Sequence, residues 1–134
     1  MPYLNDLISY LMKRNIAFHQ VNAKIIIFEL KFYKDNGSAE KVELEVHQSG
    51  DSLLVKATNN RYPDLCPNRH INDGGWFCLG LGEDISQLTI SQWVMNLKLY
   101  LDAQQKCESK RVWPCGGETK ACAHADTEKY QKII

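Results

Sequence analysis

Residues 24–57 read KIIIFELKFYKDNGSAEKVELEVHQSGDSLLVKA, and this stretch decides the fold class. Its apolar and polar side chains alternate, which is the pattern of a strand with one face in the core and one in water. In residues 24–33 the apolar face carries Ile26, Phe28, Leu30 and Phe32. In residues 40–47 it carries Val42, Leu44 and Val46, with Glu43, Glu45 and His47 between them. We expect strands at about 24–33 and 40–47.

Two further strands are expected beside these, at about 16–21 and 53–57. Asp35-Asn36-Gly37 and Ser49-Gly50-Asp51 supply turn residues between consecutive strands. The stretch therefore predicts a four-stranded antiparallel meander with one solvent-exposed face.

A helix is predicted on each side of the sheet-forming region. Residues 4–14 place apolar residues at helical spacing on one face, and Asn15 can end that helix. Thr89 and Gln92 have the spacing of a capping box, so a second helix should begin near Ile90 and run to about Lys110. Leu88 and Trp93 are the candidate hydrophobic staple, and the buried side of the second helix should carry Trp93, Val94, Leu97, Tyr100 and Leu101.

The element order of helix, meander, loop and helix predicts an α+β fold. The 134 residues fit one domain, 1–134. Pro114, Gly116 and Gly117 break the chain after the second helix. We expect residues 114–134 to form an irregular tail with at most one short helix.

Composition excludes several classes of protein. Acidic and basic residues number 16 each, so no net field favours nucleic acid or an anionic membrane. Near the N-terminus, Asn5 and Asp6 interrupt the apolar residues and no apolar run approaches the ~20 residues of a membrane span, so neither a signal peptide nor a span is expected. Five cysteines without compact repeated spacing indicate reduced thiols in a cytoplasmic protein.

Reactive and turn-forming residues gather in residues 61–80, RYPDLCPNRHINDGGWFCLG. Its prolines and glycines predict a long ordered loop, and such loops in compact domains are usually functional. Apolar anchors for the loop are available at Tyr62, Leu65, Ile71, Trp76, Phe77 and Leu79.

The loop resembles the active-site segment of ubiquitin-conjugating enzymes, which carry His-Pro-Asn, a glycine-containing turn and then the acceptor cysteine followed by leucine. Here His70-Ile71-Asn72, Gly74-Gly75 and Cys78-Leu79 stand in that order. The similarity is closer to the bacterial members associated with cyclic-oligonucleotide-based antiphage signalling (CBASS), whose pattern is similar to residues 66–72 and 77–80. Ile71 replaces the proline, Asn72 lies nearer the cysteine, and the usual Trp-x-Pro after the cysteine is absent.

The resemblance implies an ubiquitin-conjugating-enzyme-like fold in which Cys78 is the catalytic nucleophile. A thiol with a reference pKa near ~8.5 is partly thiolate at neutral pH, attacks activated acyl groups and holds them as thioesters. Without the resemblance, the alternative is a buried structural thiol, because cysteine is among the most buried residue types.

Two neighbours of Cys78 are the other candidate site residues. Asn72 either donates to the oxyanion of the tetrahedral intermediate, worth roughly 3 kcal/mol, or ties the loop to itself as an Asx turn. His70 is expected to support the loop rather than act as a general base.

Two further residues, Cys66 and His124, carry groups that can react. Cys66 is expected to be a packing thiol. His124 is either a solvated tail residue or, as the resemblance implies for some bacterial relatives, a proton acceptor beside Cys78.

The resemblance implies a conjugating enzyme that accepts a protein C-terminus as a thioester and transfers it to a lysine amine, and no metal or cofactor is expected. By resemblance, the partner is the CBASS nucleotidyltransferase, the cyclic-oligonucleotide synthase, as acyl donor or target. The sequence has no nucleotide-binding loop, so a separate activating enzyme is one possible route. The alternatives are a catalytically inactive binding platform, or a zinc-binding module using Cys66, His70 and Cys78 with Cys122 or His124, although tight ligand pairs are missing.

Overall fold

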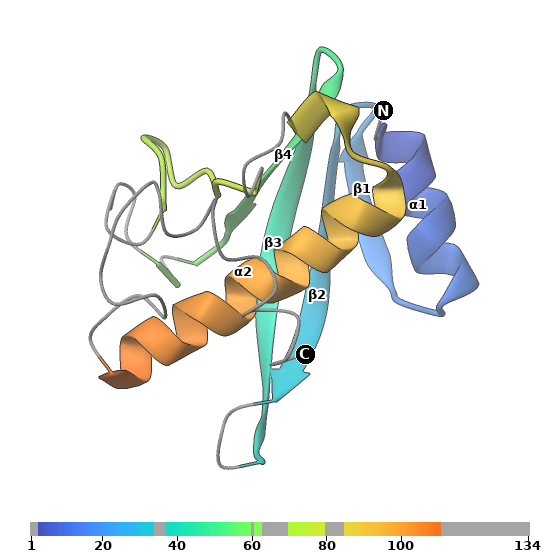
Figure 1. The fold of residues 1–134 in the computed structure, drawn as a ribbon. Coiled ribbons are helices and arrows are strands. Elements are labelled where there is room, and N and C mark those ends of the chain that lie inside the picture. The colour runs from blue at the N-terminus through green and yellow to red at the C-terminus, as the bar shows by residue number, and fades with distance from the viewer. Residues whose placement is uncertain (1–2, 34–36, 60, 63–69, 80–84, 111–134) are drawn as a thin grey trace.

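The computed structural model describes residues 3–33, 37–59, 61–62, 70–79 and 85–110. Its elements follow in the predicted order of helix, four strands and helix, with a short 3-10 turn before the last helix (Figure 1). They are α1 (Leu4–Lys13), β1 (Phe18–Asn22), β2 (Ile25–Tyr33), β3 (Ala39–Ser49), β4 (Ser52–Ala57), η2 (Ile85–Gln87) and α2 (Ile90–Lys110). The predicted α+β fold is confirmed.

The four strands form one antiparallel sheet in the order β1-β2-β3-β4. Val46 in β3 lies opposite Ile26 in β2 and Val55 in β4, so the apolar positions of neighbouring strands share one face. Ser49 pairs with Ser52 across a two-residue turn, where Gly50 takes a φ of +60°. The meander is confirmed, with β3 extended by two residues into this turn.

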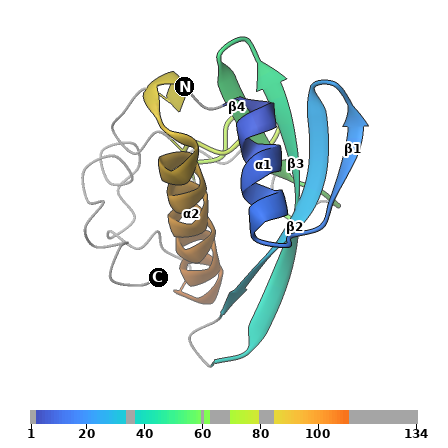
Figure 2. The same ribbon diagram turned by 90° about the vertical axis from the view of Figure 1, so that its right-hand side faces the viewer.

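Both helices cover the same face of the sheet (Figure 2). The side chains on that face, including Ile26, Leu44 and Val46, are fully buried. The opposite face carries exposed charged residues such as Glu29 and Lys41. This two-layer arrangement explains the alternation in the sequence, because only one face of each strand has apolar partners.

Helix α1 ends just before Asn15, as the sequence predicted. Asn15 adopts a φ of +56°, a left-handed conformation that asparagine tolerates better than most residues. The amide of Ile16 donates to the carbonyl of Leu11 over 2.9 Å, and the amide of Asn15 donates to that of Met12 over 3.1 Å. These two bonds form a Schellman motif that turns the chain towards β1.

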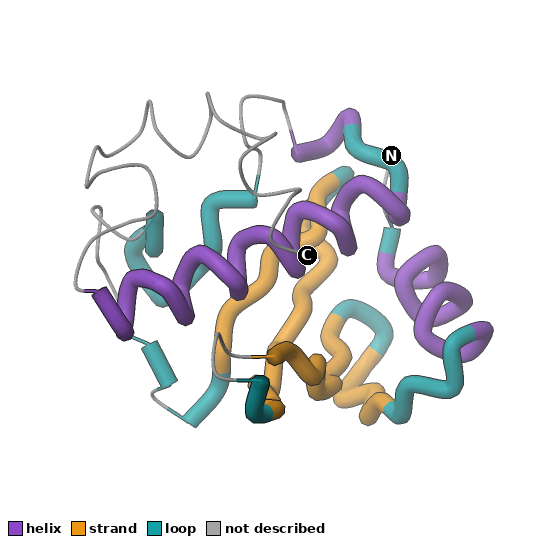
Figure 3. Tube along the Cα trace, turned by 60° about the horizontal axis from the view of Figure 1, so that its bottom comes forward, coloured by secondary structure: helices purple, strands orange, loops and turns teal. Residues whose placement is uncertain are grey.

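The predicted capping box starts α2. The Thr89 amide donates to Oε1 of Gln92 over 2.9 Å, and the Gln92 amide donates to Oγ1 of Thr89 over 3.2 Å. Leu88 and Trp93, the predicted staple, are both buried. From this start α2 runs obliquely across the strands (Figures 1 and 3).

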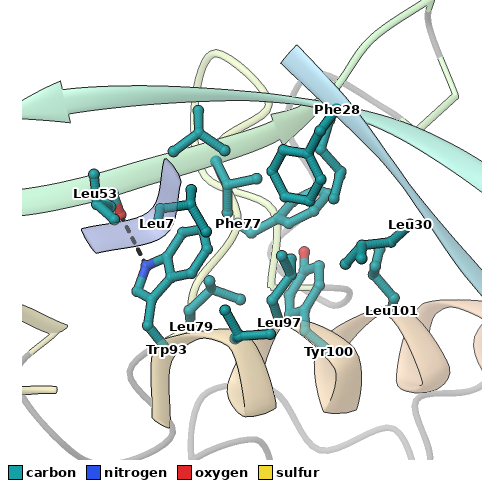
Figure 4. Packing of buried hydrophobic residues seen from close by; sticks show 14 of the residues in the cluster. Leu7, Phe28, Leu30, Leu53, Phe77, Leu79, Trp93, Leu97, Tyr100 and Leu101 are labelled. Carbon is teal, nitrogen blue, oxygen red and sulfur yellow. Dashed lines mark hydrogen bonds between the residues drawn. The ribbon is translucent and has the colours of Figure 1, made fainter. Parts of the chain in front are cut away.

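Trp93 fastens α2 to the sheet. Its side chain is fully buried, and Nε1 donates to the carbonyl oxygen of Leu53 in β4 over 3.2 Å (Figure 4). The other residues predicted for the buried side of α2, Val94, Leu97, Tyr100 and Leu101, are also buried. The helix that follows the reactive loop in sequence is thus fixed to the strand that precedes it.

Two predicted segments lie wholly or partly outside the described residues. The predicted tail 114–134 lies outside the described residues, as do Asp35 and Asn36 of the first turn, whose Gly37 has a φ of +83°. No described helix has the length and apolar character that crossing a bilayer would require.

Candidate active site

Residues 70–79 of the reactive loop close on themselves as a small antiparallel bridge. Ile71 pairs with Phe77, the Asn72 amide donates to the Trp76 carbonyl over 2.8 Å, and the Cys78 amide donates to the His70 carbonyl over 3.0 Å. This register sets His70 opposite Cys78 and Asn72 opposite Trp76. An ordered loop was predicted from the sequence, but the pairing within it was not. The Gly74-Gly75 pair between Ile71 and Phe77 is a hairpin signal.

Glycines make the tight turn of this bridge. The Gly75 amide donates to the Asn72 carbonyl over 2.9 Å, while Gly74 and Gly75 have φ values of +87° and +86°. Residues with a Cβ rarely adopt such angles. Glycine at both positions therefore allows the chain to reverse within four residues and return to Cys78.

The bridge is attached to both the sheet and the core. The Phe77 amide donates to the Val55 carbonyl of β4 over 2.9 Å, so the loop adds to the edge of the sheet. Ile71, Phe77 and Leu79 are buried, and the Phe77 ring stacks on Tyr100 of α2 with ring centroids 4.4 Å apart. Tyr62 is buried as well, so four of the predicted loop anchors are confirmed, while Leu65 lies outside the described residues.

Cys78 sits between two of these anchors, Phe77 and Leu79. Its thiol belongs to no disulfide and is half-buried, in contrast to its buried neighbours. Cys78 is therefore not a fully buried residue. A nucleophile needs access for a reactant and a fixed position, and a half-buried residue on an anchored backbone is compatible with both.

His70 is buried, with 4% of its surface exposed, and has a φ of +56°. Its carbonyl accepts two hydrogen bonds, one from the Cys78 amide and one from the Tyr100 hydroxyl over 2.9 Å. His70 thus holds the loop through its backbone carbonyl.

Asn72 is exposed, and its backbone rather than its side chain holds the turn. Its amide and carbonyl bond to Trp76 and Gly75, and its side-chain amide makes no hydrogen bond to any residue that the structure describes. The Asx turn considered as an alternative is not formed, which leaves the side-chain amide available as a donor.

Helix α2 contributes polar contacts that the sequence analysis did not anticipate. The Tyr100 hydroxyl reaches His70, Nε2 of Gln104 donates to the Tyr100 hydroxyl over 2.9 Å, and Nδ2 of Asn96 donates to the Leu79 carbonyl over 2.8 Å. These side chains recur every four residues along a helix face that is otherwise apolar. That spacing was a readable signal, because a polar residue on a core face usually has a specific partner.

On the solvent face of the sheet, Trp76 extends the site towards β3 and β4. Its ring meets His47 edge-on with centroids 4.9 Å apart, and Nζ of Lys56 lies 4.7 Å from its centroid. Glu45 contacts both partners, at 2.6 Å from Nε2 of His47 and 3.8 Å from Nζ of Lys56. Through these contacts His47, Lys56 and Glu45 hold the outer side of the loop. The sequence predicted Trp76 only as an apolar anchor.

Several sequence-predicted residues cannot be placed. Cys66, Cys115, Cys122 and His124 lie outside the described residues. Among the residues that are described, no group of three or more histidine, cysteine or acidic side chains is arranged to hold a metal ion. The zinc ligand set is therefore untested at Cys66, Cys122 and His124.

Two cavities lie away from Cys78. One of about 480 Å³ is lined by β1, β2 and β3, and one of about 250 Å³ lies between α1, β2 and α2. Cys78 lines neither cavity, so its sulfur is not at the bottom of either space.

The comparison with protein families gives one match. A family model described as the prokaryotic E2 domain matches residues 14–115, which span the sheet, the loop with Cys78 and α2. No curated protein and no solved structure gave a significant match. Since the match covers most of the chain and the fold has the expected element order, this protein belongs to the prokaryotic E2 domain family.

Proposed function

We propose that the protein is a conjugating enzyme that carries the C-terminal acyl group of a protein as a thioester on Cys78 and transfers it to a lysine amine. Membership of the prokaryotic E2 family indicates an activity of the ubiquitin-like transferase kind. The observation that carries the proposal is the half-buried thiol of Cys78 on a backbone anchored by its buried neighbours Phe77 and Leu79.

In the first step the Cys78 thiolate attacks the carbonyl carbon of an activated carboxyl group. The S–C bond forms, the bond to the activating group breaks, and that group leaves with the electron pair. The activated donor in this step is an acyl phosphate or a thioester. A separate activating enzyme is one source in this proposal.

Negative charge develops on the carbonyl oxygen during this attack. The Asn72 side-chain amide is exposed on the same loop and is not engaged elsewhere in the described structure, so it is our proposed donor to that oxygen. One preorganised donor of this kind is worth roughly 3 kcal/mol of barrier. His70, which is buried opposite Cys78, is proposed to act through the loop backbone rather than as a base.

In the second step a lysine amine attacks the thioester carbonyl. The N–C bond forms, the S–C bond breaks, the amine loses a proton to solvent and the Cys78 thiolate is regenerated. The position of Cys78, half-buried and outside the two cavities, suits this step, because both reactants are protein segments rather than small molecules.

The resemblance to CBASS-associated proteins supplies the proposed partner. The acyl donor or target is the cyclic-oligonucleotide synthase, a nucleotidyltransferase, and its modification would prime antiviral defence in the bacterial cytoplasm.

Co-expression of the protein with such a synthase and its activating enzyme tests the proposal. We expect an adduct on non-reducing gels that a thiol reductant removes and that is missing with Cys78→Ala. Cys66→Ala is the matched control, since it removes a loop thiol to which no chemistry is assigned, and it should keep the adduct. No adduct with wild type, or an unchanged adduct with Cys78→Ala, contradicts the proposal.

Iodoacetamide labelling with peptide mapping separates the enzyme from an inactive binding platform. A half-exposed Cys78 should be labelled in the native protein within minutes at pH 8. A native Cys78 that reacts only after unfolding would favour the platform.

A further inference from the structure

We propose that α2 is the positioning element of the Cys78 thiol, acting through Tyr100 and Asn96, with Gln104 supporting Tyr100. This inference rests on the proposed thioester chemistry at Cys78. None of the three side chains is proposed to touch a reactant. Their role is to fix the backbone on both sides of the nucleophile.

The three side chains form one row along α2. Residues four apart on a helix lie on the same face, so 96, 100 and 104 all point towards the layer that contains the loop. Nε2 of Gln104 donates to the Tyr100 hydroxyl over 2.9 Å, and that hydroxyl donates to the His70 carbonyl over 2.9 Å. One turn earlier, Nδ2 of Asn96 donates to the Leu79 carbonyl over 2.8 Å.

The burial of Tyr100 and Gln104 indicates that their contacts are specific. Tyr100 is 1% exposed and Gln104 is 0% exposed, within a core built mainly from aliphatic and aromatic residues. A buried hydroxyl or amide costs free energy unless it is hydrogen-bonded, and phenylalanine and leucine would fill similar space without that cost. The polar groups of Tyr100 and Gln104 are therefore explained by the hydrogen bonds that they make rather than by packing.

The His70 carbonyl links this row to the nucleophile. It accepts the Tyr100 hydroxyl and also the Cys78 amide, at 2.9 and 3.0 Å. A carbonyl oxygen has two lone pairs, so both bonds can form at once and together fix its direction. His70 holds a φ of +56°, which a residue with a Cβ adopts only when its surroundings enforce it. The Tyr100 hydroxyl is a contact that favours this conformation.

Cys78 is thus held from both sides by one helix. Tyr100 acts on the residue that binds the Cys78 amide, and Asn96 acts on the carbonyl of the next residue, Leu79. Trp93 fastens the same helix to β4 through its bond to Leu53 (Figure 4). The sulfur therefore occupies a place set by the sheet and α2 together, rather than by the loop alone.

Tyr100→Phe removes the hydroxyl and keeps the ring that stacks on Phe77. We expect amide hydrogen exchange at Cys78, measured by NMR, to accelerate about tenfold, because one hydrogen bond to its acceptor is lost. Exchange at Leu44 in the centre of the sheet should stay within about twofold of wild type. Asn96→Ala should accelerate exchange in the same loop without touching the core.

The second measurement compares two reactions of the Cys78 thiol, thioester formation and alkylation. Acyl transfer from a protein donor requires an oriented sulfur, so Tyr100→Phe should lower kcat for thioester formation about tenfold with little change in KM. Alkylation by iodoacetamide needs no fixed orientation, and its rate at Cys78 should stay within about twofold of wild type. This difference between two reactions of one thiol is not expected from a general loss of stability.

Leu101→Val is the matched control, because Leu101 is buried on α2 and is drawn towards Leu30 rather than towards the loop in Figure 4. It should lower the stability without selectively changing Cys78 exchange or kcat. Unchanged Cys78 exchange in folded Tyr100→Phe, or the same change in Leu101→Val, overturns the inference. If wild type forms no thioester while Tyr100→Phe still accelerates Cys78 exchange, the proposed function fails and the positioning by α2 stands.

Discussion

Cys78 lies directly opposite His70 in the bridge that closes the reactive loop, and its amide donates to the His70 carbonyl over 3.0 Å. The two residues are eight positions apart, and the turn between them contains Gly74 and Gly75. The conformation of that turn therefore controls where the sulfur lies.

Alanine at the two glycines of the turn should destabilise the protein to different extents. Gly75→Ala introduces an unfavourable φ but leaves the new Cβ 3.9 Å from Lys56, which is ordinary contact, so we expect a loss of about 1–2 kcal/mol. Gly74→Ala adds a Cβ only 3.2 Å from Nε1 of Trp76, so its loss should be larger. Urea unfolding measures both, with exposed Asp73→Ala as the control from the same turn. Equal stability of Gly74→Ala and Asp73→Ala would contradict the assigned turn.

Cys78→Ser should change the chemistry at position 78 without changing the conformation of the loop. The hydroxyl is close in size to the thiol, so Cys78→Ser should unfold within about 1 kcal/mol of wild type. Any adduct that it forms with the acyl donor would be an oxygen ester, which a thiol reductant does not cleave and hydroxide does. Intact-mass spectrometry after each treatment distinguishes this ester from the wild-type thioester. A reductant-sensitive adduct on Cys78→Ser would show that another cysteine carries the acyl group.

Trp93→Phe should weaken the attachment of α2 to β4. The change removes the bond from Nε1 to the Leu53 carbonyl and leaves space in a fully buried site, for a combined loss of about 2 kcal/mol. Met95→Ala is the control on the same helix, because Met95 is 44% exposed and should change stability by less than about 0.5 kcal/mol. Both values come from equilibrium unfolding, and comparable losses for the two variants would refute the role given to Trp93.

Thr89→Ala should destabilise the start of α2. It removes Oγ1, the acceptor of the Gln92 amide, and should cost about 1 kcal/mol. Ser91→Ala, at an exposed position inside the first turn, removes a hydroxyl without removing the cap and should be neutral or slightly stabilising. The thermal midpoints of the two variants give the comparison, and a Thr89→Ala midpoint equal to that of Ser91→Ala would argue against a working cap.

The sequence by itself determined the secondary structure and the order of the elements. Alternation at Val42, Leu44 and Val46 predicted a strand, and Thr89 with Gln92 predicted a helix start, because such patterns act between residues a few positions apart. Motif order also singled out Cys78, since the spacing of His70, Asn72, the glycines and the cysteine is a local property of the chain.

The tertiary structure decided how the loop is held. Tyr100 bonds to a residue 30 positions away and Asn96 to one 17 positions away, and local pattern carries no information about which backbone group a buried polar side chain will meet. Likewise, Trp76 was predicted as an apolar anchor, but the antiparallel register places its ring beside His47 and Lys56 on the outer face of the sheet. Non-local packing alone sets such partners, because they depend on where α2 and β4 lie once the core has formed.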